Sequence, residues 1–286
     1  MSITSLQFLV LFAVSLVLYY LAPKKFQWIA LLLYSVCFFV LSSTVFTGIY
    51  LLVNIVVTYF AVRLMAKAKA GGREKLAKRS LLMGILVNVG ILAILKYSGF
   101  FISIINSVIA RVGTDLRLPE PDFASPLGIS FYTIISVGYL LDCYWSQESD
   151  AQGNLMKTAL FIGYYPQMTS GPITKYQQMK EQLYAPHRFA YDKITFGMQR
   201  ILWGLFKKLV VSTRVANIVD GIYGDMQTYD GLYIWTASFL FMLQLYTDFS
   251  GCMDIIMGVS ECYGIDLPEN FKTPFFARSV QEYWQR

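Results

Sequence analysis

Residues 245–286 read LYTDFSGCMDIIMGVSECYGIDLPENFKTPFFARSVQEYWQR and place acidic side chains beside an apolar run. In a helix, Ser250, Asp254, Met257 and Glu261 would share one face, because they lie at positions i, i+4, i+7 and i+11. Acidic residues are costly inside a membrane and persist where they pair, line a cavity or lie at the interface. The pattern therefore predicts either the polar face of an amphipathic helix on a bilayer or part of a functional site.

The composition of the whole chain excludes an ordinary soluble protein. Hydrophobic residues make up 56% of the 286 and charged residues 15%, whereas soluble domains carry about 25% charged residues. The chain is predicted to be an all-α, polytopic membrane helix bundle. The net charge of +6 comes from basic connectors between apolar segments, so no nucleic-acid partner is expected. The four cysteines form no C-x-x-C pair, so neither a metal site nor a disulfide framework is predicted.

Apolar runs and basic turns predict the membrane topology. A span needs about 20 apolar residues. Spans are predicted at Ile3–Leu21, Phe26–Leu41, Val45–Met65, Leu81–Leu95, Pro126–Trp145 and Asp230–Tyr246, with a separate short apolar segment at Phe100–Val112 and a loop at Asp115–Ser125. The basic turn Lys24–Lys25 and the basic connector Lys67–Arg79 should lie in the cytoplasm, which places the N-terminus outside.

Polar and helix-breaking residues interrupt some of these spans. Asn54 and a hydroxyl-bearing side formed by Ser130, Thr133 and Ser136 predict hydrogen bonds between helices. In Leu155–Ile173, prolines and a glycine prevent a continuous helix. Broken backbone at membrane depth is tolerated only where protein or a water-filled cavity satisfies the freed groups, so this segment points to an intramembrane chamber.

Phe189–Ala216 is amphipathic, and its basic residues recur every seven positions. They are Lys193, Arg200, Lys207 and Arg214, and the opposite face carries Met198, Ile201, Leu202, Leu205 and Leu209. One interpretation is a helix on the inner leaflet with its basic residues toward the lipid headgroups. The other is a docking face for an acidic acyl donor. The only histidine, His187, lies in a polar loop and is expected to be a solvated surface residue.

Five strings occur in one order along the chain. They are GISFYT (128–133), YPQMTSGPI (165–173), GLFKKLVV (204–211), DFSGCMD (248–254) and GIDLPENFKTPFFARSVQEYW (264–284). Together they resemble the membrane-bound O-acyltransferase family, in the branch of alginate O-acetyltransferase and teichoic-acid D-alanyl transfer proteins. The resemblance implies one membrane domain over residues 1–286, with N-terminal spans in 1–97 and the family strings in 98–286.

The resemblance also implies the chemistry. An acyl thioester, acetyl-CoA or an acyl-carrier protein, arrives from the cytoplasm, and a hydroxyl of an extracytoplasmic polysaccharide accepts the acyl group. A histidine of a Trp-His pair acts as general base. No such pair occurs here, and His187 matches no catalytic position of the family. The chain is therefore expected to end before the catalytic histidine, to contain no catalytic residue and to be inactive alone. No bound cofactor is expected.

Within the matching strings, several polar residues are site candidates. Asp248, Asp254, Glu269, Asn270 and, less distinctively, Gln167 could shape the chamber or hold a histidine-bearing helix. The alternative makes Pro268–Asn270 a turn with a helix cap and the aspartates interface anchors.

Expected partners are membrane lipid, the acyl donor or its carrier protein, and an extracytoplasmic polysaccharide-modifying protein, all at a bacterial inner membrane. D-alanyl transfer to teichoic acid is the nearest alternative function. A transporter or flippase and a non-catalytic scaffold are alternatives of other classes.

Overall fold

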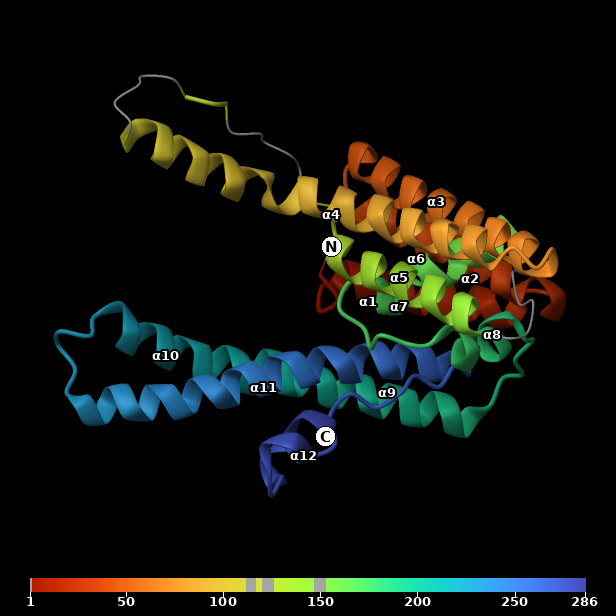
Figure 1. The fold of residues 1–286 in the computed structure, drawn as a ribbon. Helices are drawn as coiled ribbons and strands as arrows, with labels where there is room; N and C mark the ends of the chain where they lie inside the picture. Colours follow the sequence, from red (N-terminus) through yellow and green to blue (C-terminus); the bar gives the residue numbers. More distant parts are fainter. Residues whose placement is uncertain (1, 112–116, 120–125, 147–152) are drawn as a thin grey trace. The chain divides into compact units, whose positions relative to one another are not determined.

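The computed structural model describes residues 2–111, 117–119, 126–146 and 153–286 (Figure 1). All regular structure among these residues is helical, which confirms the predicted all-α membrane helix bundle. In this part of the chain, three helices are long and apolar enough to cross a membrane, over Lys24–Ser42, Thr47–Ala70 and Glu74–Arg111. The chain divides into two units. The first holds α1 (Leu6–Leu21), the start of α2 (Gln27–Ser42) and the elements from α9 onward, and the second holds the rest of α2 and the helices up to α8.

In the second unit, α3 (Val45–Ala70) and α4 (Glu74–Arg111) form an antiparallel hairpin. Gly72 makes the tight turn between them with a φ of +67°. The helices pack closely, since a Cβ at Gly84 would lie 2.9 Å from the Cβ of Ala61. This hairpin corrects two predictions. The predicted connector Lys67–Arg79 is helical except at the turn. The predicted separate segments Leu81–Leu95 and Phe100–Val112 lie in one helix of 38 residues, except for Val112, which is outside the described residues.

The physical reason for both corrections is helix propensity. Lysine, arginine, glutamate and alanine all favour helix, so a basic connector ends a helix only where glycines interrupt it. Between Leu95 and Phe100 no proline breaks the backbone, and α4 therefore continues. The predicted loop Asp115–Ser125 lies, apart from residues 117–119, outside the described residues.

Polar side chains join the helices of the second unit, as predicted. Ser136 on α5 (Ile129–Trp145) donates a hydrogen bond of 2.5 Å to Asn54 on α3. Asn88 on α4 donates to the Thr58 hydroxyl at 2.9 Å. Because these side chains are buried, each bond removes a desolvation cost of about 1–3 kcal/mol that an unpaired group would impose.

The predicted interruption after Leu155 is confirmed. Helix α6 (Leu155–Gly163) stops at Tyr164, and the short α7 (Tyr165–Met168) follows. The N–H of Tyr165, freed by the break, donates to the Ser35 hydroxyl at 3.1 Å. Protein therefore satisfies this group. The polar stretch after it contains α8 (Tyr176–Tyr184), which was not predicted.

The first unit is built on two long antiparallel rods (Figure 1). One rod joins α9 (Tyr191–Leu205), a π-helical stretch (Phe206–Ser212) and α10 (Thr213–Gly224). The other is α11 (Gly231–Cys262), which unites the predicted span Asp230–Tyr246 with the predicted helix after Ser250. The chain then returns in extended form to a 3-10 turn (Pro274–Phe276) and α12 (Val280–Gln285).

Two glycine pairs set the spacing of these rods. A Cβ at Gly197 would lie 2.6 Å from the Gly258 carbonyl oxygen, and one at Gly204 would lie 2.6 Å from that of Gly251. Real Cβ atoms do not come so close, so only glycine permits this approach. Small residues of this kind let helix backbones meet in membranes. The hydrophobic effect does not drive helices together in lipid, so their association depends on such close packing.

Helix α11 ends in a glycine cap that contacts the single histidine. Gly264 has a φ of +83°, and the N–H of Ile265 bonds to the carbonyl of Ser260, as in a Schellman motif. The His187 ring packs on Gly264, and its Nδ1 lies 2.9 Å from the Tyr19 hydroxyl of α1. The expectation of a solvated His187 is therefore wrong: the residue is half-buried and helps to join α1 to the end of α11.

Candidate functional site

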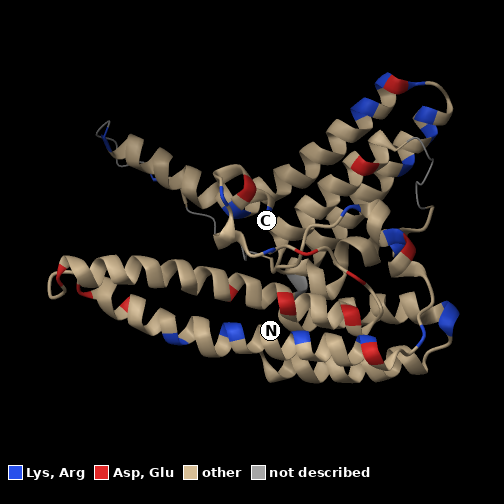
Figure 2. Cartoon of the chain, turned by 90° about the horizontal axis from the view of Figure 1, so that it is seen from below, with Lys and Arg blue, Asp and Glu red and all other residues tan. Residues whose placement is uncertain are grey.

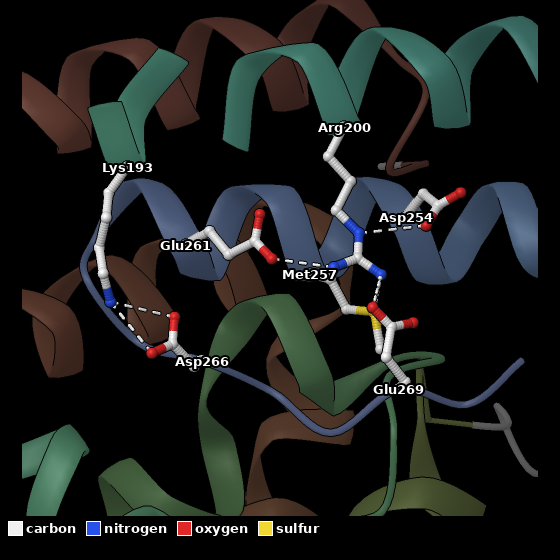
Figure 3. Close-up of polar contacts among 7 residues, drawn as sticks. All are labelled: Lys193, Arg200, Asp254, Met257, Glu261, Asp266 and Glu269. Atoms are coloured by element: carbon white, nitrogen blue, oxygen red, sulfur yellow. Dashed lines mark hydrogen bonds and ion pairs between the residues drawn. The ribbon is translucent and has the colours of Figure 1, made fainter. Parts of the chain in front are cut away.

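Arg200 is the centre of a group of charged side chains between α9 and α11 (Figure 3). Its Nε donates to Asp254 at 3.1 Å, and its Nη1 donates to Glu261 at 2.8 Å. Its Nη2 donates to Glu269 at 2.5 Å and also lies 2.8 Å from the sulfur of Met257. The planar guanidinium thus uses all three of its nitrogens, which a lysine could not do.

Two lysines extend this group toward the middle of α11. Lys207 forms an ion pair with Asp254 and donates to the Ser250 hydroxyl at 3.1 Å. Lys208 forms an ion pair with Asp248. We name the ionic cluster as the set that shares contacts with Arg200 or Lys207: Arg200, Lys207, Ser250, Asp254, Met257, Glu261 and Glu269.

The cluster follows from the glycine spacing. On each helix a charged residue stands three positions after a glycine of the pair, as in Gly197 and Arg200 or Gly258 and Glu261. Residues three apart lie on neighbouring parts of one helix face. The close backbone approach therefore brings basic side chains of α9 and acidic side chains of α11 to the same line, where Figure 2 shows blue and red residues together.

Burial separates this cluster from ordinary surface ion pairs. The side chains of Arg200, Glu261 and Lys207 are each 14% exposed, and that of Asp254 is 16% exposed. Lys193 and Asp266, paired at 3.0 Å further along, are 49% and 62% exposed. A surface pair contributes about 0–1 kcal/mol, whereas breaking a buried pair by removing one partner costs about 3–5 kcal/mol.

The cluster holds two cations and three carboxylates, so its formal charge is negative. Among the described residues, the Oε2 atom of Glu261 is buried and has no hydrogen-bond partner. In the part of the chain that the structure describes, no group of His, Cys, Asp or Glu residues is arranged to hold a metal ion.

The structure confirms the face predicted for α11. Ser250, Asp254, Met257 and Glu261 lie on one helix and all contact Arg200 or Lys207. This face is half-buried against α9 and is not the wet side of an interfacial helix.

The other site candidates predicted from the sequence differ in whether they contact the basic residues of the first unit. Asp248 pairs with Lys208, and Glu269 reaches Arg200 from the extended segment after α11. Asn270 donates to the sulfur of Met253 at 3.2 Å. The interpretation of Pro268–Asn270 as a helix cap is wrong, because the next helical turn begins only at Pro274. Gln167 is buried in α7, which belongs to the second unit.

At the centre of the stripe the basic residues do not point outward, contrary to the headgroup interpretation. Arg200 and Lys207 point to α11, whereas the apolar residues Leu202 and Leu209 are 64% and 49% exposed. Apolar side chains on a membrane protein can face lipid at no cost, while charged ones need partners.

Arg214 leaves the stripe, and the π-helical stretch explains why. It is exposed and makes no ion pair with a described residue. Each π turn takes an extra residue, so the seven-residue spacing loses register between Lys207 and Arg214. Sequence spacing placed Glu261 on the predicted face but did not point to Lys208 or Asp266, whose partners lie more than thirty-five residues away in the chain.

The ionic cluster lies within a stretch that matches a known family. Residues 145–286 match the membrane-bound O-acyltransferase family. These residues belong to that family. The membrane-bound O-acyltransferase stretch thus includes α9, α11 and the extended segment that carries Glu269.

Several curated proteins are similar to this chain over more of its length. A probable alginate O-acetylase of Azotobacter vinelandii is 31% identical over 272 residues, which are 94% of this chain and 52% of the relative. A peptidoglycan O-acetyltransferase of Helicobacter pylori is 27% identical, covering 82% of this chain and 47% of the relative. A teichoic acid D-alanyltransferase of Bacillus subtilis is 26% identical over 64% of this chain and 48% of the relative. The chain spans about half the length of these relatives.

Proposed function

We propose that this chain is part of a membrane acyltransferase that moves an acyl group, acetyl, from a cytoplasmic thioester donor to hydroxyls of an extracytoplasmic cell-envelope polysaccharide. The observation that carries the proposal is the family match over residues 145–286, supported by relatives named as O-acetylases of alginate and peptidoglycan. The proposed donor is acetyl-CoA or an acyl-carrier protein.

The proposed reaction breaks a thioester C–S bond and forms an ester C–O bond. A base must take the proton of the acceptor hydroxyl, and the departing thiolate must receive one. His187 is the only histidine of the 286 residues. Its ring contacts the Tyr19 hydroxyl and packs on Gly264. We therefore assign His187 a structural role. The family resemblance implies that the base is a histidine, and His187 matches no catalytic position of the family.

In this proposal, Arg200 is a positioning residue. It ties the extended segment after α11 to both helices through Glu269, Asp254 and Glu261. Because Arg200 of α9 binds both α11 and this segment, the backbone of the segment has a fixed path. An acyltransferase needs such fixed walls to hold its two substrates in the orientation for reaction.

D-alanyl transfer is the second candidate. The Bacillus subtilis relative supports it, with lower identity and less coverage of this chain than the alginate O-acetylases. The two reactions differ in the acyl group and its carrier, so they are separated by the label that reaches the polymer.

The experiment expresses the chain in a bacterium that lacks its own polysaccharide O-acetylase. It is expressed alone and as a fusion with the second half of the Azotobacter vinelandii relative, and labelled acetyl and labelled D-alanine are followed into the cell envelope. Acetyl transfer in either form supports the proposal. Transfer of D-alanine alone favours the second candidate, and no transfer by either form refutes both.

Three variants of the active form test the residue roles. Arg200→Ala should reduce transfer strongly. Arg214→Ala, which removes an exposed arginine that pairs with no described residue, should not. A His187→Gln variant should keep activity at normal protein levels. Loss of activity in a His187→Gln variant that folds normally would show that His187 is not merely structural.

A further inference from the structure

A second group of basic residues lies in the second unit, at the turn between α3 and α4. The turn between α3 and α4 and the end of α5 line an open pocket of about 1060 Å³ in the second unit. Among the described residues, its basic lining residues are Lys69, Arg73, Lys75 and Arg79, and its acidic one is Glu74. Figure 2 shows basic residues gathered around this turn. None of Arg73, Lys75 and Arg79 forms an ion pair with a described residue, so the described part of the chain leaves their charges uncompensated.

One wall of this basic pocket is held in place by Lys69. Its ammonium donates to the carbonyl oxygens of Cys143, Tyr144 and Ser146, which are the last turn and the end of α5. A cation on these carbonyls caps the helix and fixes the end of α5 beside the α3–α4 turn. Lys69 therefore fixes the shape of the pocket, whereas Arg73, Lys75 and Arg79 are exposed and pair with no acidic side chain that the structure describes.

The rest of the lining suits a phosphate at a membrane surface. The N-terminus of α4 opens at Glu74, and its first N–H groups add positive potential beside Arg73 and Lys75. Trp145, 70% exposed, stands on the wall with Tyr144. Such aromatic residues mark the headgroup level of membrane proteins. The volume exceeds that of one inorganic phosphate and is in the range of pockets for whole small molecules.

We propose that this basic pocket binds a phosphate-bearing ligand at the membrane surface, supplied either as the headgroup of an anionic phospholipid or as the diphosphate of coenzyme A. Arg73, Lys75 and Arg79 would contact the phosphate, and Trp145 would lie against the rest of the ligand. The site stands on its own geometry and does not depend on acyl transfer. It also differs from the α9 stripe, where Arg200 and Lys207 are already paired.

The test uses the full chain purified in an uncharged detergent. It is titrated separately with dioctanoyl phosphatidylglycerol, dioctanoyl phosphatidylcholine and coenzyme A, and tryptophan fluorescence is recorded. A Trp145→Phe variant identifies the part of the signal that comes from the pocket. Saturable binding of phosphatidylglycerol in preference to phosphatidylcholine supports the lipid source, and saturable binding of coenzyme A supports the donor source. Absence of both overturns the proposal.

A charge-matched pair of variants locates the site. Arg73→Gln/Lys75→Gln should weaken binding roughly 30-fold, since each basic residue near an anionic surface contributes about 1 kcal/mol. Lys24→Gln/Lys25→Gln removes the same charge from the other basic turn and should change binding less than about twofold. Equal weakening by both pairs would show diffuse attraction and no pocket. Helical circular dichroism checks that each variant is folded, and the preference of the unchanged chain between the two lipids tests the proposal without any variant.

Discussion

Replacing Arg200 by methionine removes the guanidinium while keeping most of the side-chain volume. The carboxylates of Asp254, Glu261 and Glu269 then lose a shared partner at 2.5–3.1 Å. Asp254 retains Lys207, and Glu269 is 45% exposed and can be solvated, so Glu261 is left with the largest penalty. Removing one partner of a buried pair costs about 3–5 kcal/mol. Because two of the three carboxylates keep a partner or solvent, we take the lower end of this range. We expect the free energy of unfolding to fall by about 3 kcal/mol.

The assay is thermal unfolding in detergent, followed by circular dichroism. For a chain of this size about 1 kcal/mol corresponds to about 2–4 °C, so Arg200→Met should lower Tm by about 6–12 °C. Lys193→Met is the control, because its pair with Asp266 is exposed and contributes at most about 1 kcal/mol. The double variant Arg200→Met/Glu261→Gln should recover part of the loss, since it leaves no unpaired charge at Glu261. Equal shifts for Arg200→Met and Lys193→Met would refute this account of the ionic cluster.

Three further predictions concern glycines and the histidine. Gly258→Leu should separate α9 from α11 and lower Tm strongly, because its Cβ would lie 2.5 Å from the Gly197 carbonyl oxygen; Gly221→Ala, with open space around it, should have no such effect. Gly264→Ala should cost about 1–3 kcal/mol in unfolding experiments, because its φ is positive and an added Cβ would lie 2.9 Å from the His187 ring. Burial lowers the pKa of His187, so the unfolded chain binds its proton first. Stability measured against pH should therefore decrease as pH falls below about 6.5 towards the folded pKa, and His187→Gln should remove that decrease.

Periodicity in the sequence predicted the parts of the fold that depend on one helix at a time. The shared face of Ser250, Asp254 and Glu261 followed from spacing alone, and the break after Leu155 followed from proline and glycine. These features are local, so they do not depend on which helix packs against which.

Pairing between helices could not be predicted in the same way. The stripe of Lys193, Arg200 and Lys207 was visible, but its direction depends on α11, more than forty residues later in the chain. Membrane burial also reverses the usual rule for amphipathic helices. In lipid the apolar side faces outward and the charged side needs protein, so the same pattern supports two opposite orientations. The contact of Glu269 with Arg200 has no periodic signal, because the segment that carries it is not helical.

The π-helical stretch at Phe206–Ser212 has a consequence for insertions and deletions in this rod. A π turn accommodates one additional residue without turning the helix that follows, so α10 keeps Val219 and Ile222 buried although the heptad count has slipped by one. Deleting one residue inside the stretch would convert it to ordinary α-helix and leave the packing of α10 unchanged. The same deletion within α9 would rotate the residues before it by about 100° relative to the residues after it. Arg200 would then point away from its carboxylates. Length variation in homologous chains should therefore be found in this stretch and be absent between Gly197 and Gly204.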